Sequence, residues 1–192
     1  ELLFGSSEIR GRTFAIKGIG KVGTELCRLI YEGGGEITIA DIDSTASKGM
    51  QKLFPRVRIV DSSEIHKQEV DIYAPWALGN EFTNVTVPEL RCKIICGGAN
   101  NQLASDEIGE LLFKRGVTYI PDYVANAGGL INVVAELDSN GYSRERVKNK
   151  VKQIGATTKE ILKIAHTLGE APSRVADRIA REIFLRKRPL PG

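Results

Sequence analysis

Short apolar runs alternate with helical patterns over the first two thirds of the chain. Such runs, bounded by glycine, proline and polar turn residues, are typical of strands buried on both faces of a parallel sheet. The predicted strands span Thr13–Ile16, Ile37–Ala40, Arg56–Val60, Asp71–Ala74, Cys92–Cys96 and Val117–Ile120. This alternation of strands with helices predicts an α/β fold built on a doubly wound parallel sheet.

Apolar residues at three- and four-residue spacing predict the helices. The helices expected between strands span Val22–Ile30, Thr45–Leu53 and Asp106–Lys114. After Ile120 the strand pattern stops, and the helices expected there span Asn126–Leu137, Ser143–Leu168 and Ser173–Arg186. Ser143 is a preferred N-cap residue, and Pro172 separates the last two helices. The pattern therefore predicts a single α/β domain with C-terminal helices.

The first predicted strand leads directly into a glycine motif, Gly18-Ile19-Gly20-Lys21-Val22-Gly23. In a dinucleotide-binding Rossmann fold, the first glycine permits a tight turn and the second lets the backbone approach a pyrophosphate. The third allows the helix to pack close to the strand, and the helix N-terminus offers unpaired N–H groups to the phosphates. A glycine-rich turn that binds nothing is the alternative.

An acid follows the second predicted strand at the distance that the dinucleotide motif requires. Asp41 lies about twenty residues past the glycines, where a carboxylate accepts hydrogen bonds from the adenosine ribose hydroxyls. A carboxylate there would repel the additional phosphate of NADP, and Asp43 adds negative charge. The sequence therefore predicts NAD as the cofactor, and a turn that binds nothing would leave the position of Asp41 as a coincidence.

Three loops after later strands combine small residues with carboxamides. They span residues 74–79, 97–103 and 121–132. Ligands of doubly wound sheets bind at the carboxyl ends of the strands, so these loops are expected at the site. Glycine and alanine let a flat ring approach, and asparagine donates and accepts hydrogen bonds without charge, as a nicotinamide pocket requires. Asn and Gly that only form turns remain the alternative.

Composition and charge exclude several classes of partner. With 192 residues, of which 42% are hydrophobic, the chain can bury the core of one domain. A net charge of +3 without interleaved aromatic residues argues against nucleic-acid binding. No apolar run approaches the length of a membrane span, and no signal peptide pattern opens the sequence. We therefore expect a cytoplasmic protein that binds neither nucleic acid nor membrane.

The cysteines and histidines do not indicate a metal or catalytic site. Cys27, Cys92 and Cys96 cannot form a complete disulfide framework and lack the paired spacing of zinc ligands. We expect them reduced and mostly buried, with Cys92 and Cys96 on one face of their predicted strand. His66 and His166 are isolated in the sequence and are interpreted as solvated or packed residues.

Five motifs occur in order: GIGKVG, ITIADID, DIYAPWALG, GGANNQL and PDYVANAGGLINV. With these motifs the sequence strongly resembles the NAD-binding domain of the Glu/Leu/Phe/Val amino-acid dehydrogenase family, and within it the leucine and phenylalanine dehydrogenase branch. The resemblance covers residues 12–138, and the later GYSRERV and VADRIARE segments also fit. It implies a Rossmann domain over residues 12–142, with residues 1–11 ending an interdomain segment and residues 143–192 forming helices packed on the domain.

The resemblance also implies roles for individual residues. The cofactor-binding positions that it implies are Gly18, Gly20, Lys21, Val22, Gly23, Asp41, Ile42, Ala77, Leu78, Asn100 and Asn126. Ala77 and Leu78 would line the adenosine side, while Asn100 and Asn126 would bind the nicotinamide carboxamide. Asn100, Leu130 and Val133 would contact the amino-acid substrate. Trp76 replaces the smaller residue, often Cys, that the branch tends to carry, and it could narrow or reshape the cofactor cleft.

The family's catalytic lysines and aspartate belong to an N-terminal domain, and no segment of this sequence matches them. We therefore expect a fragment of a longer, homo-oligomeric enzyme that binds cofactor but does not turn over alone. The implied reaction is reversible oxidative deamination of an L-amino acid to a 2-oxo acid and ammonia. Two alternatives remain, a nucleotide-sensing regulatory Rossmann module and an S-adenosylmethionine methyltransferase.

Overall fold

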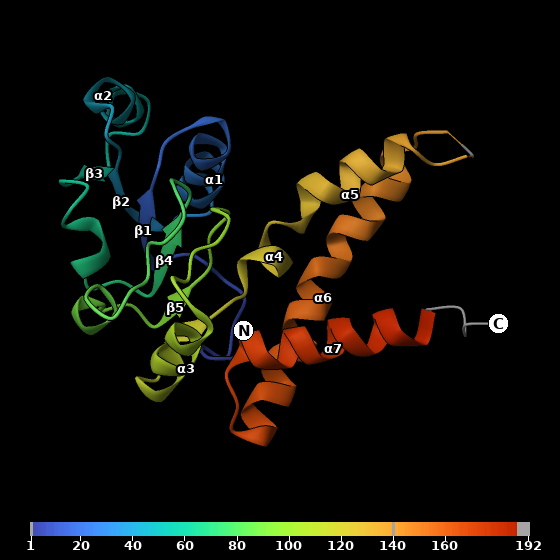
Figure 1. Ribbon diagram of the computed structural model, residues 1–192. Coiled ribbons are helices and arrows are strands. Elements are labelled where there is room, and N and C mark those ends of the chain that lie inside the picture. The colour runs from blue at the N-terminus through green and yellow to red at the C-terminus, as the bar shows by residue number, and fades with distance from the viewer. Residues whose placement is uncertain (1, 140, 188–192) are drawn as a thin grey trace.

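The computed structural model describes residues 2–139 and 141–187 and contains a six-stranded, all-parallel sheet (Figure 1). The strands are β1 (Thr13–Lys17), β2 (Glu36–Ala40), β3 (Arg58–Ile59), β4 (Ile72–Pro75), β5 (Ile94–Ile95) and β6 (Thr118–Tyr119). Their spatial order is β3-β2-β1-β4-β5-β6. This order confirms the predicted doubly wound Rossmann fold, in which the direction of winding reverses between β1 and β4.

The helices of the sheet region are α1 (Lys21–Glu32), α2 (Ser44–Leu53), α3 (Asp106–Lys114), the short α4 (Asp122–Ala125) and two 3₁₀ turns, η1 (Ile65–Lys67) and η2 (Val87–Glu89). The C-terminal helices are α5 (Ala127–Glu136), α6 (Arg144–Leu168) and α7 (Pro172–Lys187). The helix predicted from near Asn126 to Leu137 is confirmed as α5, which has Asn126 and Leu137 as its two caps, whereas the short α4 before it was not predicted.

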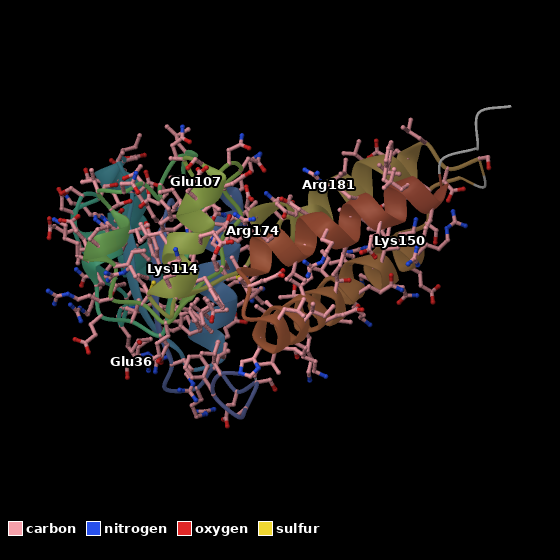
Figure 2. All side chains as sticks on the ribbon, turned by 60° about the horizontal axis from the view of Figure 1, so that its bottom comes forward. Glu36, Glu107, Lys114, Lys150, Arg174 and Arg181 are labelled. Carbon is pink, nitrogen blue, oxygen red and sulfur yellow. The ribbon has the colours of Figure 1, made fainter. Side chains whose placement is uncertain are left out.

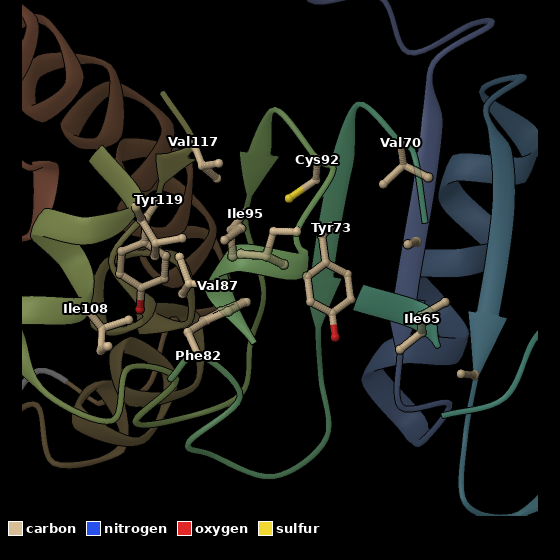
Figure 3. Close-up of a cluster of buried hydrophobic side chains, with 14 residues drawn as sticks. Ile65, Val70, Tyr73, Phe82, Val87, Cys92, Ile95, Ile108, Val117 and Tyr119 are labelled. Carbon is tan, nitrogen blue, oxygen red and sulfur yellow. The ribbon is translucent and has the colours of Figure 1, made fainter. Parts of the chain in front are cut away.

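The sheet separates two hydrophobic clusters. Because side chains alternate along a strand, Phe14 and Ile16 of β1 pack on one face with α1, while Ala15 packs on the other. Figure 3 shows this second cluster, in which Phe82 packs edge-on against Tyr73 and Tyr119 with ring centroids 6.0 and 6.2 Å apart. Burial on both faces is the property that the apolar strand patterns predicted.

The cysteines depart in part from the expectation. All three are free; Cys27 and Cys92 are buried, and burial raises their pKa values to about 11 and about 12, so their thiols stay protonated at neutral pH. Cys96 is exposed. The prediction that Cys92 and Cys96 share one face of a strand is wrong, because the strand covers only Ile94–Ile95 and its alternation does not reach them.

The helices α5, α6 and α7 form an arm that extends away from the sheet (Figure 1). Ile161 and Ala165 of α6 pack on Val175 and Ala176 of α7. Arg174 lies at the base of α7 (Figure 2). It forms an ion pair with Glu110 of α3, which links the arm to the sheet region. In the described part of the chain, no helix is both long and apolar enough to cross a membrane.

Candidate functional site

The turn between β1 and α1 is shaped by two glycines that have no room for a side chain. Gly18 has a φ of 101°, and a Cβ there would lie 2.9 Å from the backbone nitrogen of Ala77. A Cβ at Gly23 would overlap the carbonyl oxygen of Gly18. These contacts bring α1 directly against the turn, in agreement with the structural roles expected for the first and third glycines.

Gly20 differs because the space above it is open. It is the N-cap of α1, and a Cβ added there would meet no atom within 4 Å. Among the described residues no side chain caps this helix end, and its first turn contains no acidic residue. The unpaired N–H groups of α1 therefore face a free space, beside which the exposed Lys21 and Val22 lie. This arrangement fits a bound phosphate group.

Asp41 lies at the end of β2 and connects it to the glycine turn. Its Oδ2 accepts a hydrogen bond from the backbone N–H of Ile19 at 2.6 Å, and its Oδ1 accepts one from that of Asp43 at 2.8 Å. A carboxylate has about four acceptor positions, so two remain for ribose hydroxyls. Asp43 caps α2 by accepting from the Thr45 N–H at 2.8 Å, and Ile42 between the two acids is 94% exposed.

The loops that follow β4 and β5 are joined along their backbones. The N–H of Asn80 donates to the carbonyl of Asn101 at 2.7 Å, and both asparagines have positive φ angles, of 57° and 53°. A Cβ at Gly79 would lie 2.6 Å from the carbonyl oxygen of Asn100. Ala77 and Leu78, at the start of this loop, are exposed near the glycine turn.

The two predicted nicotinamide-end asparagines meet in the structure. The Nδ2 of Asn126 donates to the Oδ1 of Asn100 at 2.7 Å and to the carbonyl of Gly98 at 3.4 Å. Beside them, the N–H of Asn101 donates to Oδ2 of Asp122 at 2.5 Å. Three sequence-distant loops therefore converge at the carboxyl edge of the sheet, and the Asn pair retains amide groups for a ligand.

Two of the residues predicted to contact the substrate, Leu130 and Val133, lie on α5, about one and two turns after Asn126. Leu130 and Val133 are three residues apart and so share one side of the helix. Both are exposed, at 68% and 55%. The structure places them on the arm, beyond the amide pair along the chain.

Supporting contacts below the loops were not found from the sequence. The Nζ of Lys17 lies 2.7 Å from Oε2 of Glu81, and the buried Tyr73 hydroxyl donates to Oε1 of the same carboxylate at 2.5 Å. Burial and the Glu81 charge raise the pKa of Tyr73 well above its ordinary value, so the phenol stays protonated. Gln102, fully buried, donates to the carbonyls of Gly97 and Ala99. The only sign of these contacts in the sequence was Lys17, a charged residue at the end of an otherwise apolar strand.

A family model described as glutamate/leucine/phenylalanine/valine dehydrogenase matches residues 38–180. The chain belongs to this family. Leucine dehydrogenase of Bacillus cereus is 39% identical to it over 179 residues, phenylalanine dehydrogenase of Thermoactinomyces intermedius 41% over 181, and valine dehydrogenase of Streptomyces coelicolor 39% over 191. These alignments cover 93, 94 and 98% of this dehydrogenase-family chain, and 48, 49 and 52% of the relatives. The chain therefore spans about half the length of these curated relatives.

Solved structures agree with the dehydrogenase family. L-Tryptophan dehydrogenase from Nostoc punctiforme superposes with a TM-score of 0.89 at 37% identity, covering 93% of this chain and 53% of that one. Glutamate dehydrogenase from Peptoniphilus asaccharolyticus superposes with a TM-score of 0.65 over 97% of this chain and 49% of that one. Its 20% identity supports the fold alone. The resemblance inferred from the five sequence motifs is thereby confirmed.

Proposed function

We propose that this chain is the NAD-binding part of an amino-acid dehydrogenase that reversibly deaminates an L-amino acid to a 2-oxo acid and ammonia. The observation that carries the proposal is the open, uncapped N-terminus of α1 at Gly20, next to Asp41 on the same edge of the sheet. A pyrophosphate would occupy the space above Gly20, and the adenosine ribose would reach the Asp41 carboxylate.

The preference for NAD over NADP rests on charge. Asp41 and Asp43 place two carboxyl groups at the ribose end. Asp41 accepts hydrogen bonds from the backbone N–H groups of Ile19 and Asp43, and the Asp43 carboxylate accepts one from the N–H of Thr45, so these hydrogen bonds come from the backbone rather than from an arginine. A 2′-phosphate there would meet like charge. Ala77 and Leu78 would border the adenosine side, with Lys21, Val22 and Ile42 lining the phosphate and ribose.

The amide pair supplies the other end of the site. Asn126 and Asn100 are proposed to bind the nicotinamide carboxamide, with Asn100 also contacting the substrate. Leu130 and Val133 offer exposed apolar side chains that would face the side chain of the amino acid. The three relatives named above are a leucine, a phenylalanine and a valine dehydrogenase, which supports an apolar amino acid as substrate.

In the proposed reaction the substrate loses a hydride from its α-carbon and a proton from its amino group, and water then converts the imine to the 2-oxo acid with release of ammonia. Bound NAD supplies the hydride acceptor. The residues of this chain orient the two reactants, which lowers the entropic part of the barrier. The proton-transfer residues are assigned to an N-terminal catalytic domain of the whole enzyme, which we expect to be a homo-oligomer.

Calorimetric titration of the chain with NAD and NADP tests the proposal. We expect saturable NAD binding and much weaker NADP binding, and Asp41→Asn should reduce this difference. Glu36→Gln is the matched control, because Glu36 starts the same strand, β2, at the opposite edge of the sheet, where it is exposed (Figure 2). Tighter NADP binding would contradict the assignment of Asp41.

Turnover provides a second test. The purified chain should bind NAD without producing NADH from leucine, valine, phenylalanine or tryptophan, because the proton-transfer residues are assigned elsewhere. Detectable deamination would overturn the assignment of the proton-transfer residues to another part of the enzyme. A regulatory nucleotide-sensing module remains the alternative, and it would bind ADP-ribose as tightly as NAD, since it would make no use of the amide pair.

A further inference from the structure

Trp76, the only tryptophan of the chain, is the first residue after β4 and lies beneath the candidate site. Its backbone N–H donates to the carbonyl of Lys17 at 2.7 Å, which continues the pairing of β4 with β1. The side chain is partly buried and packs on the hydrophobic cluster of β1, β2 and α1. Its position at the reversal point of the sheet puts it between the loops that follow β1 and β5.

One side of Trp76 contacts the glycine turn. A Cβ at Gly18 would lie 3.0 Å from the Trp76 carbonyl oxygen, and one at Gly23 would lie 3.8 Å from the Trp76 Cβ. The pyrophosphate end of the site therefore rests directly on this residue. Any shift of the Trp76 backbone would displace the turn that Gly18 and Gly23 form.

The indole ring lies on the backbone of the loop after β5. A Cβ at Gly98 would overlap the ring at Cζ3, with Cε3 and Cη2 also in its path, so only glycine fits opposite this ring. The carbonyl of Gly98 in turn accepts the hydrogen bond from Asn126 Nδ2. The ring thus supports the peptide group that holds one member of the amide pair.

We propose that Trp76 is a positioning residue that sets the separation between the pyrophosphate turn and the Asn100–Asn126 pair. The inference rests on the proposed function, because it assigns those two regions to the two ends of NAD. Substitution of Trp76 should therefore lower the affinity for a ligand that spans both ends more than the affinity for a ligand that occupies only the adenosine and pyrophosphate end.

The indole nitrogen argues against a role as core filler only. Nε1 of Trp76 is buried and has no hydrogen-bond partner among the described residues. Burying an unpaired donor destabilises a fold, and a phenylalanine would supply an aromatic ring without that cost. Stability alone therefore does not favour tryptophan here, whereas the larger area of the indole is what reaches Gly98.

The test compares the affinities of NAD and ADP-ribose, which lacks nicotinamide, for the chain and for Trp76→Ala. We expect Trp76→Ala to weaken NAD binding about tenfold and ADP-ribose binding less than about twofold, as the loss of a contact between coupled neighbours predicts. Equal weakening of both ligands, or no weakening of either, would overturn the inference. Thermal unfolding of each variant verifies that the comparison is made on folded protein.

Two further variants keep the test decisive. Trp76→Phe retains a ring, so it should fold and weaken NAD selectively by a smaller factor than alanine; an unchanged ratio of the two affinities would contradict the proposal. Gly98→Ala should weaken NAD selectively in the unsubstituted chain but have little further effect on Trp76→Ala, since the clash then has no partner. Equal effects of Gly98→Ala in both backgrounds would also contradict it.

Ligand binding by the unsubstituted chain distinguishes a failure of the proposed function from a failure of the positioning role of Trp76. If it binds neither NAD nor ADP-ribose, the proposed function fails and the inference about Trp76 fails with it. If it binds both, and Trp76→Ala does not distinguish them, the proposed function stands and only the positioning role is lost.

Discussion

At the pyrophosphate end of the proposed cleft, the six residues from Gly18 to Gly23 make the turn, the helix start and the open space, whereas the nicotinamide end is assembled from separate loops. Gly18 and Gly23 act through the absence of side chains, because a Cβ at either would strike backbone atoms. Asn100 and Asn126 act through side-chain amides that hold each other. The first end depends on local chain geometry and the second on contacts between distant segments.

This difference predicts how each end responds to substitution. Changes in the glycine turn should affect every ligand that carries a pyrophosphate, because in the proposed binding mode all of them would use the α1 N-terminus. Changes beneath or within the amide pair should affect only ligands that carry nicotinamide. The ratio of NAD affinity to ADP-ribose affinity therefore reports which end a substitution has disturbed.

The largest effect is expected for Gly23→Ala. Its Cβ would overlap the carbonyl of Gly18, so the turn must shift and α1 must move away. Overpacking of this kind costs about 1–3 kcal/mol of stability. We expect NAD and ADP-ribose binding to fall together by about a hundredfold, which is about 2.7 kcal/mol. Calorimetry and chemical denaturation measure the two effects.

Two other glycines provide controls for that substitution. Gly20→Ala should lower stability only slightly, through the weaker N-cap preference of alanine, because its Cβ meets no atom. It should nevertheless weaken both ligands by filling the phosphate space. Gly49→Ala, in the open interior of α2, should stabilise the fold by about 0.5–1 kcal/mol and leave binding unchanged. Normal NAD affinity in Gly20→Ala would contradict the placement of the pyrophosphate.

The next effect in size concerns the Lys17–Glu81 ion pair, which lies below the glycine turn and the loop after β4. Glu81→Gln leaves the Lys17 ammonium without its charged partner. The site is largely buried, because the Lys17 and Glu81 side chains are 21% and 9% exposed. Removing the charge of one partner in such a partly buried, hydrogen-bonded pair should lower the free energy of unfolding by about 2–3 kcal/mol. The double variant Lys17→Gln/Glu81→Gln should regain part of that loss, since it leaves no unpaired charge. Urea denaturation checks this, and an unchanged midpoint for Glu81→Gln would refute it.

A smaller and more selective effect is expected for Asn126→Ala. It removes the hydrogen bonds to Asn100 and Gly98 and the amide proposed to bind the carboxamide. We expect NAD affinity to fall about tenfold, or about 1.4 kcal/mol, with ADP-ribose affinity unchanged. Asn84→Ala, at an exposed position in the loop after β4, is the matched control. A parallel loss of both ligands would place Asn126 outside the nicotinamide end.

The smallest effect lies at the opposite edge of the sheet. Burial raises the pKa of Asp71, but hydrogen bonds from Lys93 and the Thr13 N–H, and the charges of Lys93 and Arg12, outweigh it and hold the pKa below the ordinary 3.8. The resulting stabilisation is present above pH 3.8 and is lost as the pH falls through the lower folded pKa. Asp71→Asn should therefore lower stability at neutral pH by up to about 1 kcal/mol.

Acid titration of unfolding measures that effect. The difference between the unsubstituted chain and Asp71→Asn should shrink as the pH falls below about 4. NAD binding should be the same in both proteins, because Asp71 lies at the amino edge of the strands. A constant difference from pH 7 to pH 2 would show that Asp71 does not act through its charge.

Local features were predicted well from the sequence. Ser143 was expected to start a helix, and its hydroxyl accepts a hydrogen bond from the N–H of Arg146 at 3.3 Å. The ends of strands were predicted less well. β5 pairs with each neighbour through only two residues, because the register between strands, rather than the apolar run Cys92–Cys96, decides where pairing stops.

The succession of strands along the chain, the glycine turn and the acid at Asp41 followed from the amino-acid sequence, because turns, helix starts and buried strands depend on neighbouring residues. The pairing of Asn126 with Asn100, the ion pair of Lys17 with Glu81, and the indole on Gly98 depended on the folded arrangement. These contacts join segments separated by many residues, and their geometry is set by how parallel strands align at one edge of the sheet.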